Sequence, residues 1–164
     1  MTRIALVPGC LALLPAYASL LDPVPELRAA CAEAVAWLGE DVRIVAADQG
    51  RRVAEALLAT RTGVAGDGGS SYLVVANGAA TRSERAPGYL DERAFDFDRA
   101  LAKSLIAPDP AALRAVDTDL SHALWADVAT LAPLADLLDA AHLESVDYDD
   151  DPYGVQYWVL RWAS

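Results

Sequence analysis

The sequence predicts a single α/β domain with three layers, in which a mixed central β-sheet is flanked by helices. Short β-branched runs alternate with helical periodicities early in the chain, and helical patterns cluster later. The chain ends in alternating side-chain types that are typical of a strand. Its 164 residues match a common size for one domain, so we expect residues 1–164 to form one domain.

The N-terminal half predicts strands separated by helices. Pro8-Gly9 ends the first strand, and Pro23 and Pro25 suit a helix entry because no amide donor is needed in the first turn. The glycine-rich stretch Thr62–Ser71 predicts a flexible loop. The expected elements are strands at Ile4–Val7, Val42–Ala47 and Tyr72–Ala76, and helices at about Glu26–Leu38 and Arg52–Ala59.

The C-terminal half predicts several helices and a closing hairpin. Pro108-Asp109-Pro110 separates the first two helices. The alternation of Val155, Tyr157 and Val159 with polar and aromatic neighbours predicts a long last strand. The expected elements are helices at Asp91–Ile106, from Asp109 or Pro110 onward, and at Leu131–His142, then a hairpin from Val146 to Trp162 that turns at Asp149–Pro152.

Composition and charge exclude several partners. The net charge of -11 disfavours nucleic acid and anionic membrane surfaces. Cys10 and Cys31 form no disulfide framework and no CxxC pair, which favours buried thiols in a reducing cytosol and therefore a cytoplasmic location. Arg3 and the apolar run after it resemble a signal peptide, but Pro8 and Pro15 interrupt the run, and we interpret its start as a buried strand.

No motif points to a metal or a familiar nucleophile. His122 and His142 both fall in expected helices without a second ligand at metal spacing, so no metal site is predicted. Ser121 and His122 are adjacent and would point about 100° apart on a helix. The acidic run Asp147–Asp151 lacks the calcium-loop pattern and predicts an exposed turn. The glycines from Gly63 to Gly69 lack a phosphate-binding pattern.

Four segments carry a resemblance to a known family. They are Asn77–Asp91, Phe95–Arg99, Asp109–Leu113 and Asp151–Tyr157. Their strand-end motif, Gly-Tyr pair, Phe-Asp helix and closing Pro-Tyr-Gly-Val-x-Tyr strand are similar to class III extradiol ring-cleavage dioxygenases, in particular a bacterial branch called LigB-like. The resemblance covers the C-terminal half well and the N-terminal part only in outline.

The resemblance implies an iron site that this sequence does not complete. Catalytic members hold Fe(II) with two histidines and a carboxylate, and another histidine transfers protons. The iron histidines would follow the first two strands and the third would fall near Ala79–Thr81. Here Val7–Leu11, Ala46–Gly50 and Ala79–Thr81 contain no histidine. The resemblance therefore implies a retained scaffold with no Fe(II), no cofactor and no catalytic residue to carry over.

Any surviving pocket is expected beyond the carboxyl ends of the strands, where open α/β sheets bind ligands. Cys10 is either reactive or a buried structural thiol. Arg82 and Arg85 either clasp a carboxylate ligand or pair with Glu84, Asp91 or other surface acids. The candidate pocket residues are Cys10, Asp48, Asn77, Thr81, Arg82 and Glu84.

Two functions remain open at this point. The first is a metal-free, non-catalytic binding or assembly protein, either a homodimer or bound to a protein partner, with a small molecule as a further ligand. Tyr157, Trp158 and Trp162 would then line an interface or, as we prefer, pack in the sheet core. The second is an enzyme with altered chemistry that acts on a small aromatic or carboxylate substrate. The missing histidines favour the first.

Overall fold

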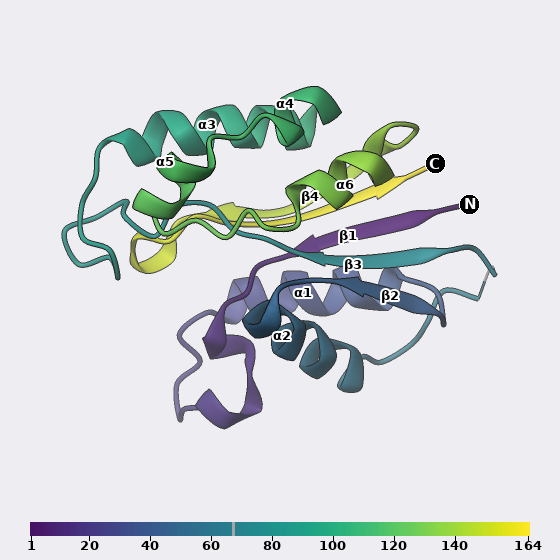
Figure 1. The fold of residues 1–164 in the computed structure, drawn as a ribbon. Helices are drawn as coiled ribbons and strands as arrows, with labels where there is room; N and C mark the ends of the chain where they lie inside the picture. Colours follow the sequence, from purple (N-terminus) through teal and green to yellow (C-terminus); the bar gives the residue numbers. More distant parts are fainter. Residues whose placement is uncertain (67) are drawn as a thin grey trace.

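A mixed sheet of five strands forms the centre of the computed structural model, which describes residues 1–66 and 68–164 (Figure 1). The order is β2-β3-β1-β5-β4; β1, β2 and β3 are mutually parallel, and β5 runs antiparallel to both β1 and β4. The predicted α/β class is confirmed. The strands are β1 (Arg3–Val7), β2 (Val42–Val45), β3 (Ser71–Val75), β4 (His142–Asp150) and β5 (Tyr157–Ala163).

Helices cover both faces of the sheet and complete the three layers (Figure 1). One face carries α1 (Pro25–Trp37) and α2 (Asp48–Ala59), and the other carries α3 (Arg93–Ile106), α4 (Pro110–Arg114), α5 (Thr118–Ala123) and α6 (Leu131–Leu138). In β1, Ala5 and Val7 belong to the first core, whereas Ile4 and Leu6 belong to the second. Because both faces are covered, a continuous apolar run is stable in this strand.

The aromatic residues of β5 pack mainly inside the protein. Trp158 and Trp162 are at most 1% exposed, and Tyr157 is half-buried. The Trp162 indole donates a hydrogen bond of 3.0 Å to the Leu105 carbonyl oxygen on α3. The preferred prediction of core packing is confirmed for both tryptophans, and their proposed place in a dimer interface is wrong.

Several element boundaries differ from the predictions, among them the hairpin: β4 begins at His142 rather than Val146 and continues through Asp149 and Asp150, where a turn was expected. The helix expected to reach His142 ends at Leu138, and His142 instead opens β4, where Leu143 pairs with Trp162. Alanines at 140 and 141 extend the local helical pattern, but pairing with β5 decides the conformation. The helix expected from about Arg52 starts earlier, at Asp48, since the Arg51 amide already donates to the Ala47 carbonyl oxygen.

The predicted loop Thr62–Ser71 contains no helix among its described residues and becomes β3 at Ser71, while its residue 67 lies outside the described part of the chain. Residues Thr2 and Ser164 exchange two backbone hydrogen bonds, which places the two termini side by side where β1 starts and β5 ends (Figure 1). Over the described residues, no helix combines the length and apolar character needed to cross a membrane.

Candidate functional site

A cavity of about 780 Å³ lies beyond the carboxyl ends of the three parallel strands. Cys10 contributes from the segment after β1, Gln49 from the start of α2 after β2, and Asn77 from the segment after β3. Trp125, Asp127 and Tyr153 contribute from the C-terminal half. This is the edge at which open α/β sheets bind ligands, so the cavity is the candidate functional site.

Two side-chain amides build the floor of this cavity. The Gln49 Nε2 group donates to the Gly9 carbonyl oxygen at 2.9 Å, and the Gly9 amide donates to Asn77 Oδ1 at 3.3 Å. A Cβ atom on Gly50 would lie 2.8 Å from Cγ1 of Val75, so only glycine allows α2 to start so close to β3. Both amides therefore hold the backbone in place.

A backbone bridge brings Asp127 to the cavity. Asn77 and Asp127 exchange two backbone hydrogen bonds of 3.1 Å each. The buried Thr130 hydroxyl then donates to the Val75 carbonyl oxygen at 2.8 Å, which ties the start of α6 to the end of β3. Nothing in the local sequence around Asp127 resembles a motif, so sequence reasoning missed this residue.

The Asp127 carboxyl is half-buried and has no cationic partner among the described residues. Burial raises its pKa, and a hydrogen bond from the Ala129 amide opposes that rise only in part. The described residues that line the cavity include no lysine, arginine or histidine. Asp127 is therefore a desolvated carboxyl that faces a cavity, a combination that is enriched at functional sites.

Strained aromatic residues surround the mouth of the cavity. Among the described residues other than glycine, only Tyr89, Trp125 and Tyr153 have a positive φ, at 58–59°. Trp125 and Tyr153 line the cavity, and a Cβ atom on Gly88 would lie 3.2 Å from Trp125, which places Tyr89 nearby. Such conformations cost of order 1–3 kcal/mol each and cluster at ligand clamps and active sites.

The structure places the six predicted pocket residues in different surroundings, and only two of them line the cavity. Cys10 and Asn77 line the cavity, whereas Asp48 is exposed on the first turn of α2 and Gln49 takes the place expected for it. Thr81 is 1% exposed and lies outside the cavity wall. Glu84 is exposed and does not line the cavity either.

Arg82 is engaged in a separate cluster on the α3 side of the same loop. Its Nη1 atom lies 2.9 Å from Asp98 Oδ2, its Nε atom lies 2.8 Å from Asp151 Oδ2, and its guanidinium lies 4.7 Å from the centroid of Phe95. Asp98 Oδ1 also accepts a hydrogen bond from the Ala79 amide at 2.9 Å. Arg82 therefore pairs with acids other than Glu84 and Asp91 and does not line the cavity, and its role as a ligand contact stays a prediction.

Cys10 is a buried thiol, and Arg28, which interacts with it electrostatically, is already bound to Asp22. Cys10 is 9% exposed, and the described part of the cavity wall offers no basic side chain to activate it. Burial first, and then its interaction with Cys10, raises the pKa of the neighbouring Tyr157 hydroxyl. This hydroxyl therefore stays protonated and does not act as a base.

The side chains at the cavity do not fit the iron site that the resemblance implies. A facial triad needs two histidines and a carboxylate, whereas the described lining residues offer one carboxylate and no histidine. His122 is exposed on α5. His142 opens β4 at the end of the strands away from the cavity, and its Nε2 lies 2.6 Å from Glu144 Oε1. The described residues contain no group of three or more histidine, cysteine or acidic side chains arranged for a metal ion.

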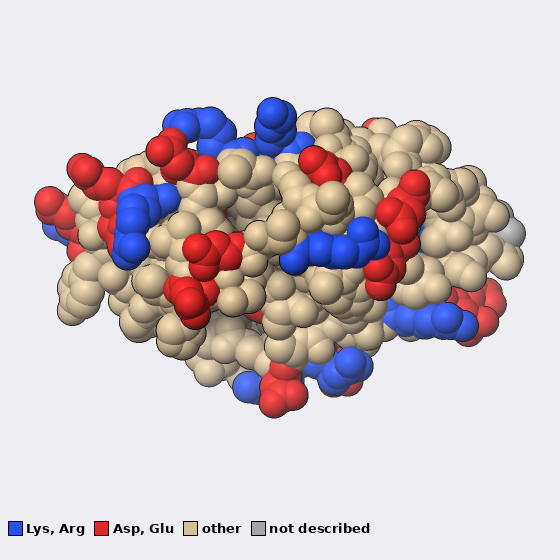
Figure 2. Space-filling view, turned by 45° about the horizontal axis from the view of Figure 1, so that its top comes forward, with Lys and Arg blue, Asp and Glu red and all other residues tan. Residues whose placement is uncertain are grey.

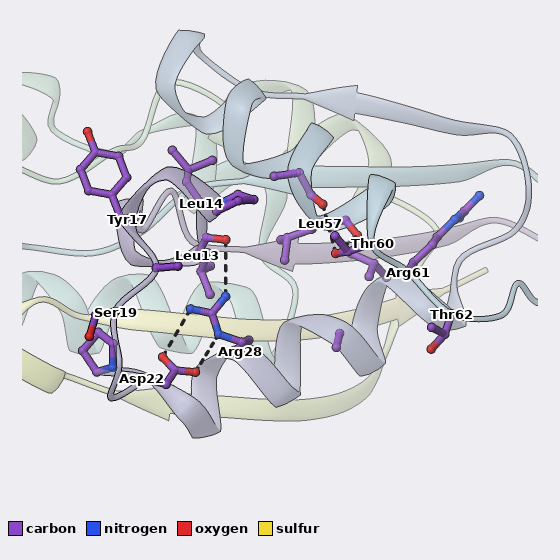
Figure 3. A pocket seen from close by; sticks show the side chains of 16 residues that line it. Leu13, Leu14, Tyr17, Ser19, Asp22, Arg28, Leu57, Thr60, Arg61 and Thr62 are labelled. Carbon is purple, nitrogen blue, oxygen red and sulfur yellow. Dashed lines mark hydrogen bonds and ion pairs between the residues drawn. The ribbon is translucent and has the colours of Figure 1, made fainter.

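A second cavity of about 400 Å³ lies between α1, α2 and the segment that precedes α1 (Figure 3). Arg28 points into it, but Asp22 binds this guanidinium at 2.7 Å and the Ala12 carbonyl oxygen accepts from it at 2.7 Å. Arg61 donates to the Gly39 carbonyl oxygen at 2.9 Å. Because Asp22, Arg28 and Arg61 are already engaged with one another or with the backbone, the described lining of this cavity offers a ligand no free charged group.

Comparison with known proteins adds no assignment, because no family model matches this sequence and a search of curated proteins finds no match. The interpretation of the site therefore depends on its geometry.

Proposed function

We propose that this protein is a non-catalytic small-molecule-binding protein, and that its ligand occupies the cavity at the ends of β1, β2 and β3. The strained aromatic residues around the mouth carry this proposal, because the fold maintains Trp125 and Tyr153 in a costly conformation while both stay more than half exposed. The resemblance to class III extradiol dioxygenases would then reflect a shared scaffold without the iron chemistry.

The size and lining of the cavity support a small organic ligand. Its volume of about 780 Å³ lies within the range of about 300–1,000 Å³ that is typical of ligand pockets. Leu11, Val24 and Val155 provide apolar wall, and few polar groups interrupt it. Since the Gln49 and Asn77 side chains already bond to the Gly9 backbone, this part of the cavity wall is formed before a ligand binds.

The second candidate function is an enzyme with altered chemistry, and one observation favours it: the raised pKa of Asp127 suits a group that transfers protons. The absence of a basic side chain from the described cavity wall weighs against the carboxylate substrate expected from the sequence. Product formation by the wild type, absent from Asp127→Asn, would distinguish the enzyme from the binding protein.

A thermal-shift experiment tests the binding function. The probes are benzyl alcohol, benzoate and benzyltrimethylammonium, which share a ring and differ in charge. Ala47→Trp fills part of the cavity from an exposed position, and Ala111→Trp, on α4 across the sheet, is the matched control. We expect at least one probe to raise the Tm of the wild type and the control but not that of Ala47→Trp. Equal shifts in all three proteins, or none in any, would overturn the proposal.

The expected homodimer or protein partner stays a prediction. Size-exclusion chromatography with light scattering tests the homodimer directly.

A further inference from the structure

The charge around the strand-end cavity differs from the charge over the face that carries α3 and α4. Figure 2 shows acidic and basic side chains interspersed on the face that carries α3 and α4. Ion pairs such as Arg114 with Asp136, at 2.6 Å, occur on this surface. At the cavity, the described lining residues include the carboxyl of Asp127 and no basic side chain. A ligand therefore meets a negative group that the protein leaves without a counter-charge.

The backbone that carries this carboxyl is anchored to the sheet. The paired backbone hydrogen bonds between Asn77 and Asp127 anchor its main chain to the end of β3. The main chain that carries Asp127 is therefore tied to the sheet rather than to a free loop. A desolvated charge without a partner is unfavourable, and a cation that enters the cavity relieves that cost.

Aromatic rings provide the rest of a cation site. Trp125, Tyr153 and Tyr157 all line the cavity with Asp127. The Tyr153 hydroxyl donates to the Pro23 carbonyl oxygen at 3.1 Å, and the Tyr157 hydroxyl interacts with Cys10. Ring faces attract organic cations, so these three residues supply the aromatic part of such a site.

We propose that the cavity selects an organic ammonium ion with an apolar body, with Asp127 as its counter-ion and Trp125, Tyr153 and Tyr157 as its aromatic walls. This inference rests on the proposed binding function and names its ligand class. Asp127 also has a pKa raised by burial, and binding of a permanent cation favours the ionised carboxylate and lowers that pKa.

Isothermal titration calorimetry with three probes tests the charge preference. Benzyltrimethylammonium carries a permanent positive charge, benzyl alcohol is neutral and benzoate is negative. We expect the wild type to bind benzyltrimethylammonium at least tenfold more tightly than benzyl alcohol, and benzoate most weakly. We expect Asp127→Asn to lose the tenfold preference for the cation while its affinity for benzyl alcohol stays within about twofold of wild type.

The matched control is Asp119→Asn, which removes the same charge from an exposed position on α5 and should keep the preference. Equal or tighter binding of benzyl alcohol or benzoate by the wild type, or an unchanged preference in Asp127→Asn, would overturn the ammonium assignment. If the ring compounds still bind the wild type but not Ala47→Trp in those cases, the binding function stands. Absence of binding by all three probes would overturn both.

Discussion

Two aspartates lie on either side of the segment that follows β3, and the fold treats them in opposite ways. Asp127 bonds to Asn77 through its backbone and directs its carboxyl to a cavity without a basic residue among its described lining. Asp98 accepts the Ala79 amide and pairs with Arg82. Burial raises the pKa of both carboxyls, so desolvation affects each of them.

This difference distinguishes a carboxyl that stabilises the fold from one that is available to a ligand. Asp98 uses its oxygens on the protein itself, so it holds the loop that shapes the cavity. Asp127 has no cationic partner among the described residues, which is why we propose that a ligand supplies one. A buried carboxyl is therefore informative about ligands only after its protein partners have been counted.

The largest expected effect is the loss of Asp98. Asp98→Ala leaves Arg82 without its buried partner and the Ala79 amide without an acceptor, so we expect the free energy of unfolding to fall by about 3–5 kcal/mol. Urea denaturation measures it. The control Asp96→Ala removes an exposed carboxylate from the same helix and should change stability by less than about 1 kcal/mol. A loss below about 1 kcal/mol for Asp98→Ala would show that this cluster does not support the loop.

Alanine substitutions of Gly78 and Gly9 compare how tightly the chain packs beside Asp98 and beside the cavity. A Cβ atom on Gly78 would lie 2.5 Å from Asp98 Oδ1 and 2.9 Å from Trp158, whereas the nearest atom to a Cβ on Gly9 lies at 3.5 Å, in Val75. We expect Gly78→Ala to lose about 1–3 kcal/mol and Gly9→Ala to change stability by less than about 1 kcal/mol. Denaturant midpoints measure both, and equal effects would contradict the close packing around Asp98.

The smallest effect concerns Asp127 itself and depends on pH. Since its folded pKa is raised above the ordinary 3.8, the folded protein loses stability as pH rises through the interval between the two values. Asn does not titrate, so Asp127→Asn should have a higher Tm than the wild type at pH 7, and the difference should disappear below the ordinary pKa. Thermal unfolding across pH, with Asp119→Asn as control, measures this. A lower Tm at pH 7 would mean that the protein itself stabilises the Asp127 charge.

The fold was largely predictable because its strands are short apolar runs with clear breakers. Ile4–Val7 ends at Pro8-Gly9, and Tyr72–Ala76 ends at Asn77-Gly78, so local chemistry marks both ends. The start of β4 at His142 was not predictable. Helix-forming alanines precede it, and only the pairing of Leu143 with Trp162 decides that the chain is extended there.

The sequence predicted only part of the site, because some of its residues reach the cavity through contacts between distant segments. Cys10 and Asn77 follow parallel strands, and the rule that ligands bind beyond strand ends finds them directly. Asp127 follows no strand and reaches the cavity through a bridge to a residue far away in the sequence. Arg82 looked available because its partners Asp98 and Asp151 come from two other elements.

The sequence by itself determined the three-layer α/β class and the lack of histidines at the positions the resemblance implies for iron, because apolar periodicity and residue identity are local properties. Only the tertiary structure decided which acids are paired, which aromatics are strained and which side chains share the cavity. Those properties depend on distances between segments that the folded backbone brings together, and no local pattern encodes them.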